Sequence, residues 1–283
     1  MKDASDRFDS AVFKGWSKPG PIIPQNITAP PDQTLDAISG SYRLFQLKKG
    51  HRFSTDDLLV AWYGTSWCPR AERVLDLGSG IGAVGMIAAW RLAGAQFVTI
   101  EAQTESVVLA RSSARYNQLD HRYEIREGDF RDPSVLGSDE LFDLILGSPP
   151  YFPPGSGVEG DHPQKIACRF ELRGSIADYC AIAAAHLAPG AIFSSVFPMP
   201  DGQLERALRA AAAAKLAVVR RRPIVLCEGE PPLLSVFHMM RELDLPAWFR
   251  KQTWIEPPLT IRRRDGSVHP EYSAIKLSIG FPP

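Results

Sequence analysis

From residue 73 onward, short apolar runs alternate with longer segments in which apolar residues recur at helical spacing. This alternation is typical of a parallel sheet covered by helices on both faces. The runs predicted as strands are 73–77, 96–100, 123–126, 141–146, 191–197, 217–225 and 233–240. The segments predicted as helices are 84–92, 104–117, 176–187 and 202–215. The pattern therefore predicts an α/β fold with a mostly parallel seven-stranded sheet.

The first 40 residues have a different character. They contain Pro19, Pro21, Pro24, Pro30 and Pro31 and little apolar periodicity. Prolines remove backbone donors and interrupt helices and strands, so we expect an irregular leader over 1–40, extended or partly disordered. Residues 41–283 are then expected to form one domain, in which the late strands extend the sheet.

Composition and charge limit the possible functions. The chain has 283 residues, 45% of them hydrophobic, with 32 Lys and Arg against 32 Asp and Glu, which excludes a disordered or fibrous protein and argues against a polybasic one. From residue 215 to the end, however, 11 basic residues face 7 acidic ones. The arginine clusters 220–222 and 262–264 are candidates for phosphate contacts, or else for a solvated sheet edge.

The four cysteines are far apart and form no Cys-x-x-Cys pair, so we expect reduced thiols. The amino-terminal sequence has no apolar signal segment, and the most apolar stretch, 181–197, is interrupted by polar and proline residues. We therefore expect neither a signal peptide nor a membrane span, and a cytoplasmic protein. The histidines show no metal-ligand spacing, and no metal site is expected.

The strongest chemical signal is a glycine-rich turn after the first predicted strand, Asp76-Leu77-Gly78-Ser79-Gly80-Ile81-Gly82. Glycines let the backbone turn tightly and approach a ligand closely. The next strand leads to Glu101, about 20 residues past the turn, where a carboxylate can accept the hydroxyls of a ribose. The glycine spacing differs from the dinucleotide pattern, which favours a nucleoside without phosphates.

These features resemble class I S-adenosylmethionine-dependent methyltransferases, which have a Rossmann-like fold. The resemblance implies S-adenosyl-L-methionine as cofactor, with its methionine end beside the glycine turn, its ribose at the second strand and its adenine after the third. The residues implied at these three places are Asp76, Gly78, Ser79 and Gly80; Glu101 and Ala102; and Asp129 and Phe130.

A second motif, Ser148-Pro149-Pro150-Tyr151, follows the fourth predicted strand. It resembles the (Asn/Asp/Ser)-Pro-Pro-(Tyr/Phe) motif of methyltransferases that act on planar amino groups. The lone pair of such a nitrogen is delocalised, so the site must accept hydrogen bonds from its hydrogens and hold it toward the methyl group. Ser148 Oγ and the Pro149 carbonyl are candidate acceptors, and Tyr151 offers a face for stacking. We expect these four residues to be catalytic, Ser148 also to contact the cofactor, and Tyr151, Phe152, His162 and Arg169 to bind substrate. The alternative for Ser148–Tyr151 is a proline-rich loop with a surface tyrosine.

The segment 46–59 closely resembles the region before the first motif in bacterial tRNA adenine methyltransferases that modify a valine tRNA beside the anticodon. The segments 168–171 and 259–273 resemble the same family. The resemblance implies that Arg52, Thr55 and Asp56 lie near the methionine end of the cofactor, the alternative for Arg52 being a solvated loop. This family has Asn where the chain has Ser148, and serine there resembles enzymes that methylate the 4-amino group of cytosine.

We therefore expect an N-methyltransferase acting on the exocyclic amino group of a nucleobase, with adenine in tRNA as the first candidate. A cytosine amino group, a protein glutamine and a small-molecule or peptide nitrogen are alternatives. From a different class, the chain could be an inactive cofactor-binding subunit that holds RNA.

Overall fold

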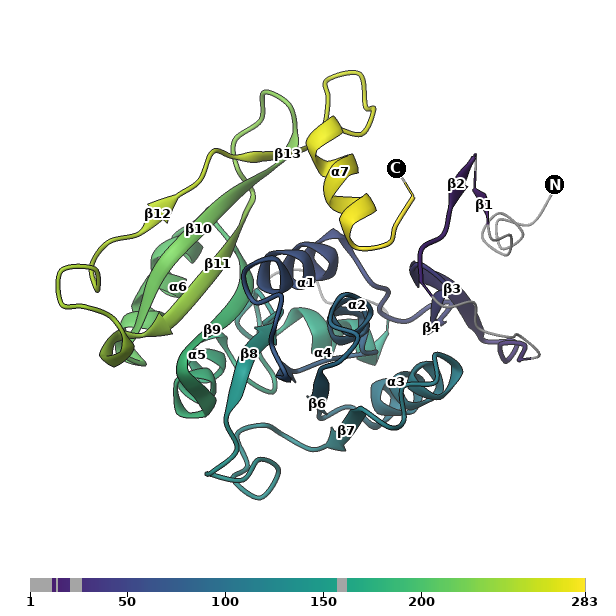
Figure 1. The fold of residues 1–283 in the computed structure, drawn as a ribbon, viewed down its shortest axis with the longest axis horizontal. Coiled ribbons are helices and arrows are strands. Elements are labelled where there is room, and N and C mark those ends of the chain that lie inside the picture. The colour runs from purple at the N-terminus through teal and green to yellow at the C-terminus, as the bar shows by residue number, and fades with distance from the viewer. Residues whose placement is uncertain (1–11, 14, 21–26, 157–161, 283) are drawn as a thin grey trace.

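The computed structural model describes residues 12–13, 15–20, 27–156 and 162–282, and its main feature is a large twisted sheet (Figure 1). In the described residues this sheet has nine strands, in the order β12-β10-β11-β9-β8-β5-β6-β7, with β13 also paired to β10. Their bounds are β5 Arg73–Leu77, β6 Gln96–Glu101, β7 Tyr123–Glu127, β8 Phe142–Gly147, β9 Leu187–Pro198, β10 Leu216–Cys227, β11 Leu234–Arg241, β12 Trp254–Ile255 and β13 Leu259–Arg262.

The predicted strands are confirmed, but the predicted number is wrong. Neighbours from β7 to β9 pair in parallel, whereas β11 runs antiparallel to β9 and β10. The two additional strands, β12 and β13, have two and four residues and pair in parallel with β10. Segments this short carry no readable alternation, so their pairing is decided by contact with β10.

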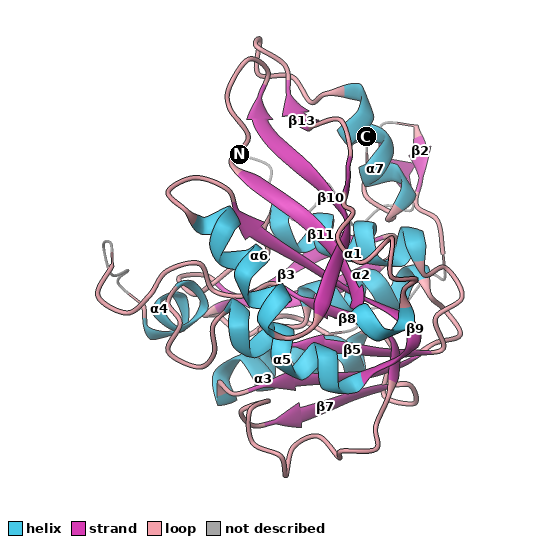
Figure 2. Ribbon diagram, turned by 90° about the vertical axis from the view of Figure 1, so that its left-hand side faces the viewer, coloured by secondary structure: helices cyan, strands magenta, loops and turns pink. Residues whose placement is uncertain are grey.

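Helices cover both faces of the sheet (Figure 2). Residues of α1, α2, α3 and α7 contribute to one apolar cluster with one face of the strands, and residues of α5 and α6 contribute to a second cluster with the other face. The helices are α1 Thr55–Trp67, α2 Ala83–Arg91, α3 Thr104–Tyr116, α4 Pro163–Arg169, α5 Ile176–His186, α6 Gln203–Ala213 and α7 Pro270–Ser278, with a 3-10 turn at Glu242–Asp244. This is the Rossmann-like α/β architecture predicted from the sequence. No helix in the described ranges is both long and apolar enough to span a bilayer.

The predicted helices α2, α3, α5 and α6 are present. The structure also contains α1, which the sequence pattern did not predict. Seven of its 13 residues are buried, on several sides of the helix. A helix that is buried on several sides has no single polar face, so the spacing of its apolar residues gives little signal. Pro163 and Pro270 each start a further helix at its first turn, where a missing backbone N–H costs nothing.

The expectation of an irregular leader over 1–40 is wrong where the structure describes strands, whereas residues 18–20 and 27–32 belong to no helix or strand. Strands β1 (Val12–Phe13) and β2 (Trp16–Ser17) form a small pair, and β3 (Gln33–Ser39) pairs antiparallel with β4 (Tyr42–Leu47). The boundary expected at residue 40 therefore falls inside a hairpin. The β4 strand is anchored on α3, because Ser113 Oγ accepts from the Phe45 N–H at 2.9 Å. Residues 1–11, 14 and 21–26 lie outside the described part of the chain.

The topology reverses between β5 and β8. The chain leaves β5 toward β6 on one side, and β8 is followed by β9 on the other. In open α/β sheets, ligands bind at the carboxyl ends of the strands where the order reverses. The glycine turn after β5 and the Ser-Pro-Pro-Tyr segment after β8 both start at this edge.

Candidate active site and cofactor cavity

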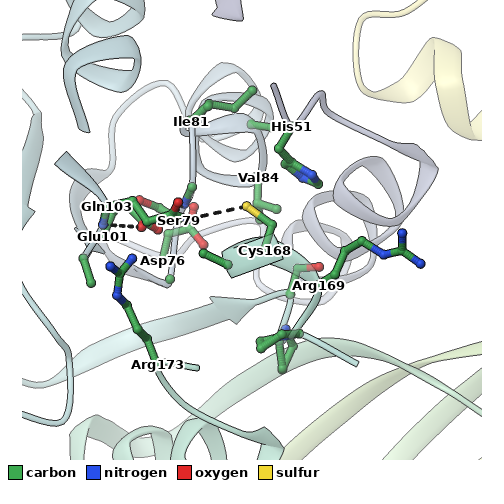
Figure 3. Close-up of a pocket in the computed structure, with 18 of the residues that line it drawn as sticks. His51, Asp76, Ser79, Ile81, Val84, Glu101, Gln103, Cys168, Arg169 and Arg173 are labelled. Atoms are coloured by element: carbon green, nitrogen blue, oxygen red, sulfur yellow. Dashed lines mark hydrogen bonds between the residues drawn. The ribbon is translucent and has the colours of Figure 1, made fainter. Parts of the chain in front are cut away.

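A cavity of about 360 Å³ opens at the carboxyl ends of β5, β6 and β8 (Figure 3). It brings together most residues that the sequence predicts for the site. Those that line it are Asp56, Asp76, Gly78, Ser79, Gly80, Glu101, Ala102, Asp129, Phe130, Ser148, Pro149, Pro150, Tyr151, Phe152 and Arg169.

The glycine turn forms one wall of the cavity. Gly78 and Gly80 have φ angles of +59° and +56°, which side chains other than glycine rarely adopt. A Cβ on Gly78 would lie 2.0 Å from the hydroxyl of Tyr179, whereas a Cβ on Gly80 would meet no atom within 4 Å. Gly80 therefore leaves room beside the backbone. The Ser79 hydroxyl is buried and has no hydrogen-bond partner.

Two carboxylates at the ends of β5 and β6 fix the glycine turn and the start of α2, which follows it. Asp76 Oδ2 accepts from the Gly85 N–H at 2.9 Å, and Glu101 accepts from the N–H groups of Gly80 and Gln103 at 2.8 and 2.7 Å. Burial raises the pKa of Glu101, and it raises the pKa of Asp76 well above that of an exposed aspartate. A carboxylate has about four lone-pair positions, so Glu101 keeps acceptor capacity for ligand hydroxyls.

The wall after β7 contains Asp129 and Phe130. The ring of Phe130 lies edge-on to Tyr179, with centroids 4.7 Å apart. Asp129 forms an ion pair with Arg131, whose guanidinium hydrogen bonds hold the pKa of this carboxyl below its usual value. The carboxylate thus stays ionised at the cavity edge and available as an acceptor.

The segment 148–152 forms the opposite wall. Pro149 is buried, while Phe152 is 36% exposed. The N–H groups of Tyr151 and Phe152 both donate to the Arg169 carbonyl at 3.2 and 3.1 Å, which ties the segment to the end of α4. The Arg169 guanidinium lies 5.8 Å from the centre of the Phe152 ring. An exposed aromatic ring and an arginine therefore flank the mouth of the cavity.

Three predicted site residues lie outside the cavity. Arg52 is exposed and pairs with Asp36 at 2.9 Å, because the unpredicted strand β3 brings that carboxylate beside it. Thr55 begins α1 and does not line the cavity. His162 caps α4 by accepting from the Gln164 N–H at 3.3 Å. The expectation that these three residues contact a ligand has no support in this geometry.

Several cavity residues were not assigned from the sequence: His51, Ser54, Asp57, Gln103, Cys168, Arg173 and Tyr179. The sequence could have indicated the position of Asp57, because Ser54 and Asp57 have the spacing of a capping box and form one at the start of α1. Burial raises the pKa of Asp57 to about 7, and burial also lowers the pKa of His51. Arg173 and Tyr179 reach the site from the chain after α4 and from α5, which only the packing reveals.

Carboxyl groups outnumber guanidinium groups along the lining. Five carboxylates, those of Asp56, Asp57, Asp76, Glu101 and Asp129, face two guanidinium groups. Figure 3 shows the Arg173 side chain pointing toward Glu101, and its charge lowers the pKa of that carboxyl against the effect of burial. Such a cavity favours a ligand that carries positive charge. Among the residues that the structure describes, no group of His, Cys, Asp or Glu is arranged to hold a metal ion.

The first of the two arginine clusters, 220–222, differs from the sequence expectation. Arg220 and Arg222 are buried and form ion pairs with Glu256 and Glu271. They are therefore not free for phosphate contacts, because the short strand β12 and helix α7 bring carboxylates onto them. The cluster 262–264 remains exposed at the end of β13.

The donor set fits S-adenosylmethionine. The glycine turn leaves room for close approach, the Ser79 hydroxyl needs a partner, Glu101 can accept ribose hydroxyls, and the acidic lining suits the sulfonium and ammonium charges. The fold and this site define a class I S-adenosylmethionine-dependent methyltransferase. Comparison with known proteins agrees, since the sequence pattern of the methyltransferase small domain family matches residues 56–166.

Individual relatives cover different shares of the chain. A tRNA1(Val) (adenine(37)-N6)-methyltransferase from Shewanella amazonensis is 29% identical over 184 residues, which are 65% of this chain and 75% of the relative. A release factor glutamine methyltransferase from Aliivibrio fischeri is 33% identical over 95 residues, but this match spans only 30% of that relative and 34% of this chain.

Solved structures support the fold. A protein described as a predicted O-methyltransferase from Agrobacterium tumefaciens superimposes with a TM-score of 0.61 at 20% identity, covering 80% of this chain and 98% of its own. A SAM-dependent methyltransferase from the same organism has a TM-score of 0.52 at 15% identity, covering 76% and 72% of the two chains.

Proposed function

We propose that the chain transfers a methyl group to the exocyclic amino nitrogen of a nucleobase, with adenine in tRNA as the first candidate acceptor. The observation that carries this proposal is the position of Ser148–Tyr151, which lines the same cavity as the glycine turn. The similarity to the tRNA adenine-N6 methyltransferase over 65% of the chain supports it.

In this proposal the cofactor lies along β5 and β6. Asp56, Asp76, Gly78, Ser79 and Gly80 surround the methionine end, and the cluster of carboxylates attracts its ammonium and sulfonium charges. Glu101 and Ala102 hold the ribose, and Asp129 and Phe130 hold the adenine. When bound, the cofactor supplies an electrophilic methyl group on its sulfonium sulfur, beside Ser148.

The acceptor base enters from the side of Phe152. Ser148 Oγ and the Pro149 carbonyl accept hydrogen bonds from the amino group, while the rings of Tyr151 and Phe152 offer faces for the base. Arg169 lies over Phe152 and can contact the phosphate backbone next to an extruded base. Further out, the exposed arginines 262–264 provide additional phosphate contacts.

A protein glutamine is the second candidate acceptor. The 33% identity to a release factor glutamine methyltransferase favours it, and a carboxamide presents the same planar NH₂ group to Ser148 and Pro149. The two acceptors differ in charge, because only RNA binding should depend strongly on the exposed arginines.

The test is incubation of the protein with radiolabelled S-adenosylmethionine and separate tRNA, DNA, protein and metabolite fractions. We expect label in tRNA, and digestion to nucleosides followed by mass spectrometry should show N6-methyladenosine. Detection of N4-methylcytidine would show that the acceptor is cytosine, and label in the protein fraction would favour glutamine. The Ser148→Ala variant serves as the matched control, since it should bind the cofactor but transfer little label.

A further inference from the structure

One buried glutamine connects three segments of the chain beside the cavity. Gln164 lies in the first turn of α4 and is only 1% exposed. Its Oε1 accepts from the His51 N–H at 2.8 Å, and its Nε2 donates to Ser106 Oγ of α3 at 3.0 Å. A backbone N–H can only donate, so it determines which end of the amide faces His51. The side chain therefore has one defined orientation.

His51 belongs to the loop 51–54, which leads into α1 and forms part of the cavity wall. His51 and Ser54 line the cavity, and the helix that follows the loop contributes two of the lining carboxylates. The four loop residues are in no helix or strand, so no regular pattern of backbone hydrogen bonds holds them. The conformation of the loop consequently depends on contacts with side chains.

Two buried amides supply such contacts from two different elements. Gln164 of α4 accepts from the His51 N–H, and Gln46 Oε1 of β4 accepts from the Phe53 N–H at 2.8 Å. The contact with α4 is close, because a Cβ added to Gly50 would lie 2.2 Å from Gln164 Oε1. Glycine at this position therefore allows the backbone before the loop to approach the amide.

The helix that carries Gln164 forms another part of the wall. Ala167, Cys168 and Arg169, near the end of α4, line the cavity, whereas Gln164 itself does not. Its contact with Ser106 holds the same helix to α3. Gln164 therefore affects the cavity through the loop 51–54 and α4, and not by touching a ligand.

We propose that Gln164 is a positioning residue for S-adenosylmethionine, because it holds the loop 51–54 in the conformation that completes the cavity. Without the amide, the His51 N–H would lose its partner and the loop would sample other conformations. Cofactor binding would then have to order the loop, and the affinity would fall by the cost of that ordering. The inference concerns cofactor binding alone and does not depend on which nitrogen is methylated.

Isothermal titration calorimetry with S-adenosylmethionine tests this role. Gln164→Met keeps an unbranched side chain but removes both hydrogen bonds, and it should raise the Kd about tenfold, the effect of one hydrogen bond. Gln164→Glu should bind nearly as tightly as the wild type, because a carboxyl oxygen still accepts the His51 N–H. Ser106→Ala leaves that acceptor in place and should raise the Kd less than Gln164→Met does.

Asn117→Leu is the matched control. Asn117 is also a buried amide that holds a backbone segment, since it accepts from the Arg43 N–H at 2.8 Å and donates to the Arg43 carbonyl at 2.7 Å. Neither residue lines the cavity, so we expect the Kd of Asn117→Leu to be unchanged. An unchanged Kd in Gln164→Met would overturn the proposal, and so would an equally raised Kd in Asn117→Leu or in Gln164→Glu.

A second measurement needs no cofactor. The His51 N–H should exchange slowly with solvent in the wild type and faster in Gln164→Met, as followed by NMR hydrogen exchange. The same rate in both proteins would show that Gln164 does not hold the loop and would overturn the proposal. Neither measurement involves the methyl acceptor, so label in the protein fraction would refute the nucleobase assignment and leave this inference standing.

Discussion

Glu101 Oε2 accepts the Gly80 N–H at 2.8 Å, which ties the end of β6 to the glycine turn after β5. The second oxygen of the same carboxylate accepts from Gln103 at 2.7 Å. The group that we propose for the ribose therefore also sets the shape of the turn beside it. A substitution at Glu101 should act on cofactor affinity through both contacts.

Glu101→Ala should weaken S-adenosylmethionine binding by roughly 1–3 kcal/mol, about 5- to 150-fold in Kd. Isothermal titration calorimetry measures this directly. Glu127→Ala is the matched control, because Glu127 ends the neighbouring strand β7, is exposed and does not line the cavity. Equal Kd values for Glu101→Ala and the wild type would show that Glu101 does not bind the cofactor.

Cofactor affinity should rise with pH around neutrality. Burial raises the pKa of Asp57 to about 7, so this carboxyl is largely protonated below pH 7 and ionised above it. Only the ionised form attracts the positive charges of the cofactor, and the affinity should fall by as much as about tenfold per pH unit below 7. Calorimetric titrations from pH 6 to 8 should show this slope in the wild type and a flatter one in Asp57→Asn. The same slope in both proteins would assign the titration to another group.

Gly78→Ala should destabilise the protein more than the backbone conformation alone explains. The left-handed conformation costs about 1–2 kcal/mol for alanine, and the added Cβ would also lie 2.0 Å from the Tyr179 hydroxyl. Gly190→Ala isolates the first effect, since Gly190 has a φ of +75° and a Cβ added there would meet no atom within 4 Å. Urea denaturation measures the free energy of unfolding. We expect Gly78→Ala to lower it by about 1–3 kcal/mol more than Gly190→Ala does, which is the usual cost of overpacking.

The stability of the fold should depend on His238 at acidic pH. This side chain is fully buried, neither ring nitrogen has a hydrogen-bond partner, and its ring lies 3.9 Å from that of Tyr63. Burial, with a further contribution from Arg220, lowers the pKa of His238 well below its ordinary value of 6.5. Below pH 6.5 the unfolded chain therefore binds a proton that the folded chain does not, and the free energy of unfolding falls.

His238→Phe keeps an aromatic ring and removes this proton. We expect its free energy of unfolding to fall less than that of the wild type between pH 7 and 5, as measured by urea denaturation. The exposed His121, changed to Phe, is the control and should leave the wild-type slope in place. If the free energy of unfolding of His238→Phe fell with pH as steeply as that of the wild type, His238 would not be the group that destabilises the fold at acidic pH.

The local pattern of residues was enough to predict much of the sheet and the segments that form the cavity. The central parallel strands β5, β6, β8 and β9 show as apolar runs because a buried parallel strand needs apolar side chains on both faces. The Gly78–Gly82 turn and the Ser148–Tyr151 segment are also contiguous in sequence. Because each follows a strand of the same parallel sheet, their order along the chain suffices to place the cavity at the carboxyl edge of that sheet.

Contacts between distant segments could not be predicted in this way. Strand β3, which follows a region rich in proline, pairs with β4 and brings Asp36 to Arg52, so an arginine expected at the cofactor pairs elsewhere. Glu256 and Glu271 likewise bind two of the arginines expected on the surface. In each case the partner is a charge far away in the chain, and no local pattern reports it.

The sequence by itself thus determined the fold class, the cofactor type and the segments that carry the chemistry, because these depend on residue type and short-range spacing. Only the tertiary structure decided which charged groups face the cavity and which partner the Tyr151 hydroxyl has. The reason is that a hydrogen bond such as that between Tyr151 and Asp56 requires two remote backbones to place their side chains within 2.5 Å, which depends on the packing of α1 and the loop after β8.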